Sequence, residues 1–248
     1  MKVGVYSAAL GAYPFCGGTL IASRWVLTAA HCIVDALGCK PVPYGRLFSY
    51  HAVTGYDMAV RLADHKYKRR ERPGFSVRVE GVIVHPHFSY LAAQSGFDVA
   101  LLKLSRRVKR SPRIEYACLP EPGLTFSVGR FCNFAGWGQI PNPPHMPLPG
   151  IPDTLMELQI PIASLSECKK EFPFVNQHLD FCTAGSHGTP CNGDSGGGLH
   201  CFTQNGSKWV VYGVSSYGDN NCTGGYNVFA LTTKKLDWII QVMTVYAY

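Results

Sequence analysis

Short apolar runs separated by glycine, proline and polar residues make up most of the hydrophobic pattern along the chain. Residues 25–28, 99–104 and 208–215 are three such runs. Residues 77–80 alternate valine with charged side chains, which is the two-residue period of a strand with one buried face. Many short strands with turn residues between them predict an all-β fold, either a sandwich or a barrel.

Two segments carry helical signals, and one segment excludes regular structure. Residues 141–152 contain six prolines in twelve residues, which predicts an extended loop. Ser164 followed by Glu167 is a capping-box pattern, and it predicts a short helix that runs through Lys170. The apolar positions near the C-terminus have i, i+3, i+4, i+7 spacing and predict one buried face of a terminal helix: Leu236, Ile239, Ile240 and Met243.

The length and the cysteine content narrow the class of protein. The chain has 248 residues, of which 46% are hydrophobic, and a single all-β unit of this size is common. It has ten cysteines without a C-x-x-C pair or a zinc-type spacing, so we expect no metal and no cofactor. Disulfides formed in an oxidising compartment explain this content better than buried free thiols, and they predict a secreted, extracellular protein.

The net charge of +7 comes partly from two basic runs, at residues 66–72 and 106–110. Such runs are usually solvated loops, and contact with a polyanion is the alternative. We expect no nucleic-acid partner. No apolar stretch reaches the length of a membrane span. The segment from Lys2 to Leu10 is shorter than a signal-peptide core, and we expect it to belong to a mature domain.

Gly193-Asp194-Ser195-Gly196-Gly197 is a candidate nucleophile turn. A serine hydroxyl becomes a strong nucleophile only when a base takes its proton. It also needs amide donors directed at the oxyanion that forms on attack. Glycines around a serine let backbone N–H groups converge. On its own, the same pentapeptide is also compatible with an ordinary tight turn.

Two further segments supply the partners that such a serine needs. His31 follows an apolar strand and the small residues Ala29 and Ala30, and Cys32 can tether its turn. Asp98 stands just before another apolar strand, where a carboxylate is costly unless it is paired. A histidine on a neighbouring loop would pair it and hold the tautomer whose Nε2 accepts the serine proton.

Taken together in the order His31, Asp98, Ser195, these segments resemble the chymotrypsin-like (trypsin-like) serine proteases over nearly the whole chain. The motifs that carry the resemblance are Phe15 to Leu20, Thr28 to Cys32, Asp98 to Leu102, Gly136-Trp137-Gly138, Gly193 to Gly197, Ser216-Tyr217-Gly218 and Leu236 to Ile239.

The resemblance implies an all-β fold of two six-stranded antiparallel β-barrels with a C-terminal helix and the active site in the cleft between them. Residues 1–248 would form one protease domain with halves at roughly 1–115 and 116–248. His31, Asp98 and Ser195 would be the catalytic residues. The N–H groups of Gly193 and Ser195 would form the oxyanion hole. Peptide or protein substrates, and protease inhibitors as further partners, follow from the same family.

The resemblance also implies the substrate-binding residues. Ser216 would hydrogen-bond the buried aspartate, and the segment from Ser216 through Tyr217 to Gly218 would pair with substrate as an added strand. Thr189 would lie at the base of the specificity pocket and Asn227 in its wall, where the side chain shortens the pocket. Because the residue at the bottom of the pocket is neutral, we expect the protease to prefer substrates with Phe, Tyr, Leu or Met, rather than Arg or Lys, before the scissile bond. Asp219 at the pocket mouth is the feature that would still attract cations.

Eight cysteines take family pairings under this resemblance. Cys118 matches a family position that often binds a light chain or a propeptide. Cys39 matches no cysteine position of the family. Cys118 therefore either pairs with Cys39 or pairs with a segment outside this sequence. The implied disulfides are Cys16–Cys32, Cys132–Cys201, Cys168–Cys182 and Cys191–Cys222.

The chain departs from the family at its start. Family members begin with an Ile-Val-Gly-Gly-like segment whose amino group pairs with the aspartate before the nucleophile, here Asp194. No such segment precedes Val3, and we expect this 248-residue form to be zymogen-like, with Asp194 solvated and the Gly193 amide misdirected. The interval between His31 and Asp98 is longer than the family norm and lacks recognisable calcium ligands, so we expect no calcium site there.

The sequence is compatible with three classes of function. An endopeptidase accounts for all triad residues, and a protease-like binding protein without turnover is the alternative. A secreted structural or adhesive module would leave the triad unexplained. Asn205-Gly206-Ser207 is also a glycosylation sequon in a polar turn, and the alternative is an unmodified turn.

Overall fold

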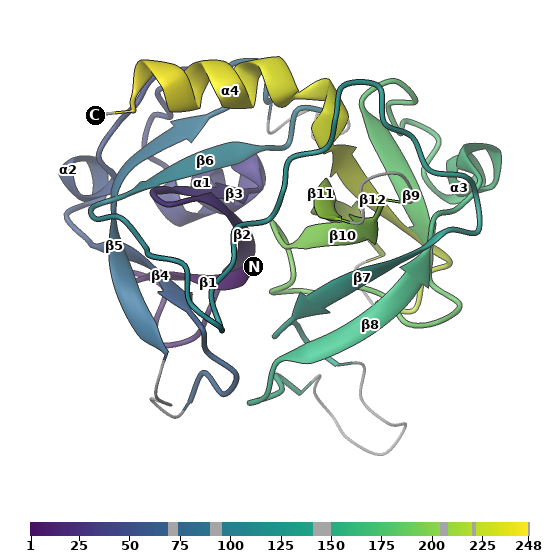
Figure 1. Cartoon of the computed structure of the whole chain (residues 1–248), viewed down its shortest axis with the longest axis horizontal. Coiled ribbons are helices and arrows are strands. Elements are labelled where there is room, and N and C mark those ends of the chain that lie inside the picture. The colour runs from purple at the N-terminus through teal and green to yellow at the C-terminus, as the bar shows by residue number, and fades with distance from the viewer. Residues whose placement is uncertain (69–73, 90–95, 141–149, 204–207, 220–221, 248) are drawn as a thin grey trace.

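The computed structural model describes residues 1–68, 74–89, 96–140, 150–203, 208–219 and 222–247, and it contains two six-stranded antiparallel sheets side by side (Figure 1). The first sheet closes into a barrel with the strand order β1-β2-β3-β6-β5-β4. Its strands are β1 (Lys2–Ser7), β2 (Cys16–Ala22), β3 (Trp25–Thr28), β4 (Met58–Leu62), β5 (Phe75–Val84) and β6 (Ala100–Leu104).

The hydrophobic pattern explains the strands of this barrel. All residues of β3 and β6 are buried, as expected for predominantly apolar runs, and the buried set includes the polar residues Thr28 and Lys103. In β5, Val77 and Val79 are buried whereas Arg78 and Glu80 are exposed, and the strand then continues with four buried residues. The buried side chains of the barrel form one core with parts of the helices α1 (Ala30–Leu37) and α4 (Leu236–Val245) and of the second sheet.

The second sheet has the strand order β8-β7-β10-β11-β12-β9. Aromatic rings fill its core: the Phe181 ring lies 4.8 Å from Tyr212 and 5.5 Å from Phe229, between ring centroids. The boundary between the halves near residue 115 stays a prediction; the last strand of the first sheet ends at Leu104 and the first strand of the second begins at Phe131. The strands are β7 (Phe131–Gly136), β8 (Met156–Pro161), β9 (Asp180–Ala184), β10 (Gly198–Phe202), β11 (Trp209–Gly218) and β12 (Tyr226–Leu231).

Two helices lie where the sequence predicts them, but the predicted capping of one and the predicted buried face of the other differ from the structure. In α3 (Leu165–Glu171) the Ser164 side chain caps no backbone N–H and bonds the Ser166 hydroxyl instead, so no capping box forms. The helix α4 (Leu236–Val245) lies along the first sheet (Figure 1). It buries Leu236, Ile239 and Val242, whereas Ile240 is 53% exposed, so the predicted apolar face was wrong at that position.

The sequence patterns did not predict the other two helices, α1 (Ala30–Leu37) and α2 (Tyr50–Thr54). The longer interval after His31 contains α2 and most of α1, and the Tyr50 hydroxyl of α2 donates a hydrogen bond of 2.9 Å to the Ala36 carbonyl of α1. Within the described residues, no helix combines the length and apolar character that crossing a membrane requires.

The structure contains the four disulfides that the resemblance implies, Cys16–Cys32, Cys132–Cys201, Cys168–Cys182 and Cys191–Cys222. Cys39 and Cys118 are exposed thiols, so the alternative in which they pair with each other is not formed. The Asn205 sequon, the proline-rich residues 141–149 and most of the first basic run lie outside the described residues.

Candidate active site

A buried carboxylate, Asp98, brings together residues from both sheets. Asp98 lies just before β6, and its side chain is almost completely buried. Its Oδ2 lies 2.7 Å from His31 Nδ1 and accepts a hydrogen bond of 2.5 Å from the Ser216 hydroxyl. Its Oδ1 accepts a bond of 2.8 Å from the His31 backbone N–H. Both oxygens are therefore satisfied, and the imidazole has one fixed orientation.

The electrostatics of this pair favour the ionised carboxylate. Burial disfavours the charge, but His31 and the hydrogen bonds outweigh burial and hold the pKa of Asp98 below its usual value. Burial also disfavours an imidazolium, but the Asp98 carboxylate outweighs burial and raises the pKa of His31. A histidine held in this way donates through Nδ1 and leaves Nε2 as the acceptor.

Ser195 lies in a tight turn before β10 that glycines make possible. Gly193 and Gly196 have φ of +95° and +77°, in the left-handed region. A Cβ on Gly196 would overlap the Thr28 side chain and the Gly17 carbonyl. The Gly17 N–H, in β2 of the first barrel, donates a bond of 2.7 Å to the Ser195 carbonyl. The turn is thus fixed against the barrel that carries His31.

His31, Ser195 and Ser216 line one cavity of about 270 Å³. Within the described residues, no hydrogen bond joins the Ser195 hydroxyl to His31, and catalytic hydrogen bonds are often long without substrate. His31 also lies near Cys16 and Cys32. Those two cysteines form a disulfide, so the group offers no thiolate to a metal.

The wall of the same cavity contains Asn227, on β12 opposite Gly218 of β11. The Asn227 side-chain amide donates a hydrogen bond to the Thr189 hydroxyl, and a Cβ on Gly218 would overlap the Asn227 Oδ1. The Asn227 side chain therefore extends between Gly218 and Thr189. The Asp219 carboxylate accepts bonds of 3.1 and 3.2 Å from the backbone and hydroxyl of Thr223.

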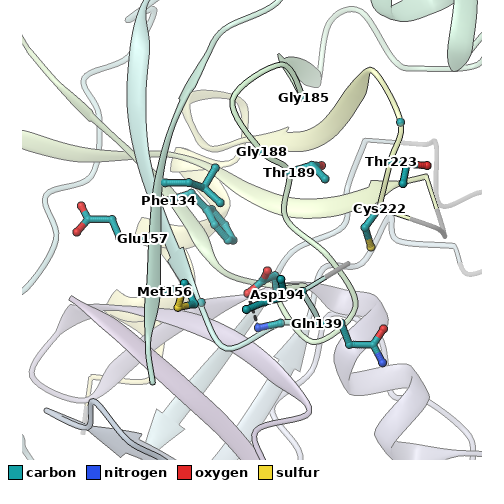
Figure 2. Close-up of a pocket in the computed structure, with 15 residues that line it drawn as sticks. Phe134, Gln139, Met156, Glu157, Gly185, Gly188, Thr189, Asp194, Cys222 and Thr223 are labelled. Carbon is teal, nitrogen blue, oxygen red and sulfur yellow. Dashed lines mark hydrogen bonds between the residues drawn. The ribbon is translucent and has the colours of Figure 1, made fainter. Parts of the chain in front are cut away.

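Asp194 lies beside a second cavity, of about 280 Å³, whose lining includes Phe134, Met156 and Thr189 (Figure 2). Its oxygens accept bonds of 2.9 Å from the Gly138 N–H and 3.1 Å from the Cys191 N–H. A side chain at Gly138 would overlap the carboxylate. Burial raises the pKa of Asp194. The expectation that Asp194 stays solvated was wrong for this structure, because backbone donors hold the carboxylate inside.

The sequence patterns did not predict the burial of three charged residues near the site. The Lys2 ammonium is buried close to the Ser195 turn. Behind Asp98, burial raises the pKa of Asp180 to about 7 and lowers that of Lys235 to about 8, and the Lys235 ammonium donates to the Leu179 carbonyl. No sequence signal distinguishes these residues from exposed strand-end or loop charges.

The second basic run surrounds another cavity, of about 350 Å³, that is lined by five cationic side chains together with apolar groups such as Phe75. The Arg106 guanidinium lies 5.1 Å from the Phe75 ring centroid. Contact with a polyanion stays a prediction, which salt-dependent retention on a sulfated polysaccharide would measure. The cationic residues are Arg106, Arg107, Lys109, Arg110 and Arg113.

Comparisons with known proteins agree with this geometry. The family model described as Trypsin matches residues 3–239. Chymotrypsin-like elastase family member 3A of Homo sapiens is 30% identical over 238 residues, covering 93% of this chain and 79% of that protein. Member 3B of Macaca mulatta is 31% identical over 236 residues, covering 92% and 82%.

Ovochymase-2 of Mus musculus is 30% identical over 243 residues, which cover 91% of this chain but only 36% of that longer protein. The match to the family model, the two sheets and the four disulfides all extend over nearly the whole chain. The chain belongs to the trypsin family of serine proteases.

Proposed function

We propose that this chain is a secreted serine endopeptidase that hydrolyses peptide bonds through an acyl-enzyme. Ser195 is the nucleophile, His31 the general base and Asp98 its orienting acid. The observation that carries the proposal is the contact of 2.7 Å between the buried Asp98 carboxylate and His31, because His31 lines the same cavity as Ser195 on its glycine turn. The four disulfides support an oxidising, extracellular location.

The reaction follows from the positions of these groups. The Ser195 Oγ attacks the carbonyl carbon of the substrate while its proton passes to His31 Nε2. The resulting oxyanion accepts hydrogen bonds from the Gly193 and Ser195 N–H groups. The imidazolium then gives the proton to the leaving amine as the C–N bond breaks, which leaves an ester on Ser195. Water attacks this ester by the same route and releases the acid.

The substrate is a peptide in extended conformation. Ser216, Tyr217 and Gly218 lie at the end of β11, beside the cavity that holds Ser195. The register of β11 with β12 shifts between Ser215 and Tyr217, a local irregularity beside the site. We infer that residues 216–218 bind the substrate backbone as an added strand.

The specificity pocket favours a neutral side chain of limited size before the scissile bond. Thr189 lies behind Asn227 and lines the neighbouring cavity, and it offers no negative charge to an Arg or Lys side chain. The Asn227 amide, bonded to Thr189, occupies the depth that an aromatic ring needs. The sequence reading proposed Phe, Tyr, Leu or Met; the position of Asn227 favours the aliphatic members of that set, and smaller aliphatic residues, over the aromatic ones.

A peptide library that varies the residue before the scissile bond tests both the activity and this preference. We expect cleavage after aliphatic residues, and Asn227→Gly should raise the ratio of Phe to Val cleavage on the order of 10²-fold, because removal of the amide deepens the pocket. Ratios within one variant cancel differences in the folded fraction. Dominant cleavage after Arg or Lys would contradict the pocket assignment, and an unchanged ratio would contradict the role of Asn227.

The cavity beside Asp194 supports the hypothesis that the same protein also has a zymogen-like state. This cavity combines an apolar lining with a buried carboxylate, which fits an amino terminus that carries an apolar side chain. We infer that a cleaved amino terminus binds there and that full turnover requires it. Charge compensation at Asp194 would then favour the turn in which both amide donors face the substrate.

Hydrolysis of a peptide ester by the protein before and after proteolytic release of an amino terminus measures this requirement. We expect a form whose amino terminus does not reach Asp194 to be slower on the order of 10²-fold, the typical cost of one lost oxyanion donor. Equal rates for the two forms would overturn the activation proposal while leaving the endopeptidase proposal intact.

A further inference from the structure

The ammonium of Lys2 is buried at the first residue of β1, in a space that only glycine neighbours leave open. Its Nζ makes no hydrogen bond within the described residues. A Cβ on either Gly17 or Gly197 would overlap this nitrogen. The Phe134 ring covers it, with the Nζ 5.0 Å from the ring centroid. A buried ammonium without hydrogen bonds is costly, so an opposite charge is needed to compensate it.

The two glycines that surround the ammonium also hold the Ser195 turn. The Gly17 N–H donates to the Ser195 carbonyl over 2.7 Å, and the Gly197 N–H donates to the Asp194 carbonyl over 3.0 Å. The Lys2 side chain is thus packed directly beneath the segment that carries Asp194 and Ser195. A change in the charge of Lys2 acts on this turn at short range.

Asp194 supplies the opposite charge. Burial lowers the pKa of Lys2 to about 8, and the Asp194 carboxylate opposes this decrease. In return, Lys2 opposes the increase that burial causes in the pKa of Asp194. Other titratable groups also face Lys2. His200 stays neutral because burial lowers its pKa to about 3, and Glu157 and the amino group of Met1 lie around the adjoining cavity.

We propose that Lys2 is a positioning residue: its buried ammonium compensates Asp194 from inside the first barrel and holds the Gly193–Ser195 turn in the conformation that stabilises the oxyanion. The inference rests on the proposed function. It gives Asp194 a second compensating cation besides the cleaved amino terminus, and this cation is part of strand β1. A consequence is that the protein retains part of its oxyanion stabilisation when no amino terminus is bound at Asp194.

Lys2→Met removes the charge and keeps most of the side-chain volume. We expect kcat for a peptide ester to fall 10- to 100-fold with a smaller change in KM, because oxyanion donors act mainly in the transition state. Lys103→Met is the matched control: Lys103 is also buried in this barrel, but its ammonium lies 3.4 Å from Glu80 rather than against Gly197 of the Ser195 turn. An equal fall in kcat for both variants would overturn the proposal.

The pH dependence of kcat separates a charge effect of Lys2 from a packing effect, because a side chain that only fills space would not change this dependence. Deprotonation of Lys2 leaves Asp194 without this compensation, so kcat of the 248-residue chain should decrease as the pH rises through about 8. In Lys2→Arg the guanidinium stays protonated, and the decrease should move to higher pH. If the alkaline limb coincides in wild type and Lys2→Arg, the charge of Lys2 has no role in positioning.

A double-mutant cycle measures the pair without relying on activity. In the Ser195→Ala background, urea unfolding of Lys2→Met, Asp194→Asn and the double variant should show coupling of at least tenfold in the unfolding equilibrium constant. Additive effects would overturn the proposal even for an active protease. Coupling in a protein without turnover would instead contradict only the endopeptidase proposal. If Asp194→Asn fails to fold, the kcat and pH comparisons decide.

Discussion

Ser195→Ala should lower kcat for a peptide substrate by about 10⁶-fold, with much less change in KM. The hydroxyl is the only atom of the turn that can form the acyl-enzyme, and the turn is fixed by the Gly17 hydrogen bond and by glycines on both sides. His31→Ala should cost about as much, because nucleophile and base act as one unit. The turnover that remains reflects oxyanion stabilisation and substrate binding alone.

A fluorophosphonate probe checks the same residue through its chemistry. The processed protein should form an adduct at Ser195, because only an activated hydroxyl displaces fluoride from phosphorus. Ser111→Ala is the control and should label like wild type, because Ser111 is an exposed residue in an isolated β-bridge with Ile114. Labelling that persists in Ser195→Ala would show that the nucleophile lies elsewhere. A processed protein that does not label would favour the protease-like binding protein.

The motif spacing and the strand patterns were sufficient to predict the parts of the molecule that depend on local sequence. The apolar runs at 25–28 and 99–104 form the fully buried strands β3 and β6, because they contain few polar groups to keep at the surface. Asp98 is predictable because a carboxylate beside such a strand requires a partner, and His31 and Ser216 provide it. The disulfides followed from the family resemblance rather than from the patterns.

The features that the sequence did not reveal depend on contacts between distant segments. Lys2 resembles any strand-end lysine until β1 pairs with β2 and places its ammonium against Gly17 and Gly197. Asn227 and Thr189 are 38 residues apart, and their hydrogen bond exists only after β12 has paired with β9 and β11. Such charges and amides acquire their roles from tertiary packing, which hydrophobic periodicity does not encode.

Asp98→Asn should reduce kcat by about 10⁴-fold while the fold stays intact. An asparagine oxygen can still accept from the His31 backbone N–H, as Oδ1 of Asp98 does over 2.8 Å. The amide nitrogen then takes the place of Oδ2, which lies 2.7 Å from His31 Nδ1. A donor at this point forces Nδ1 to accept, so Nε2 carries the proton and no longer accepts one from Ser195.

The same variant should move the acid limb of kcat/KM. In the wild type, His31 is a base only when neutral, so activity rises with pH through a histidine pKa that Asp98 has raised. Without that carboxylate, burial dominates and lowers the pKa of His31, and the limb shifts to lower pH. Asp35→Asn is the control, since Asp35 is exposed at the rim of the same cavity and raises the pKa of His31 less than Asp98 does. Its plateau should match wild type. An Asp98→Asn protein with a wild-type plateau, or with an unmoved limb, would show that another group orients His31.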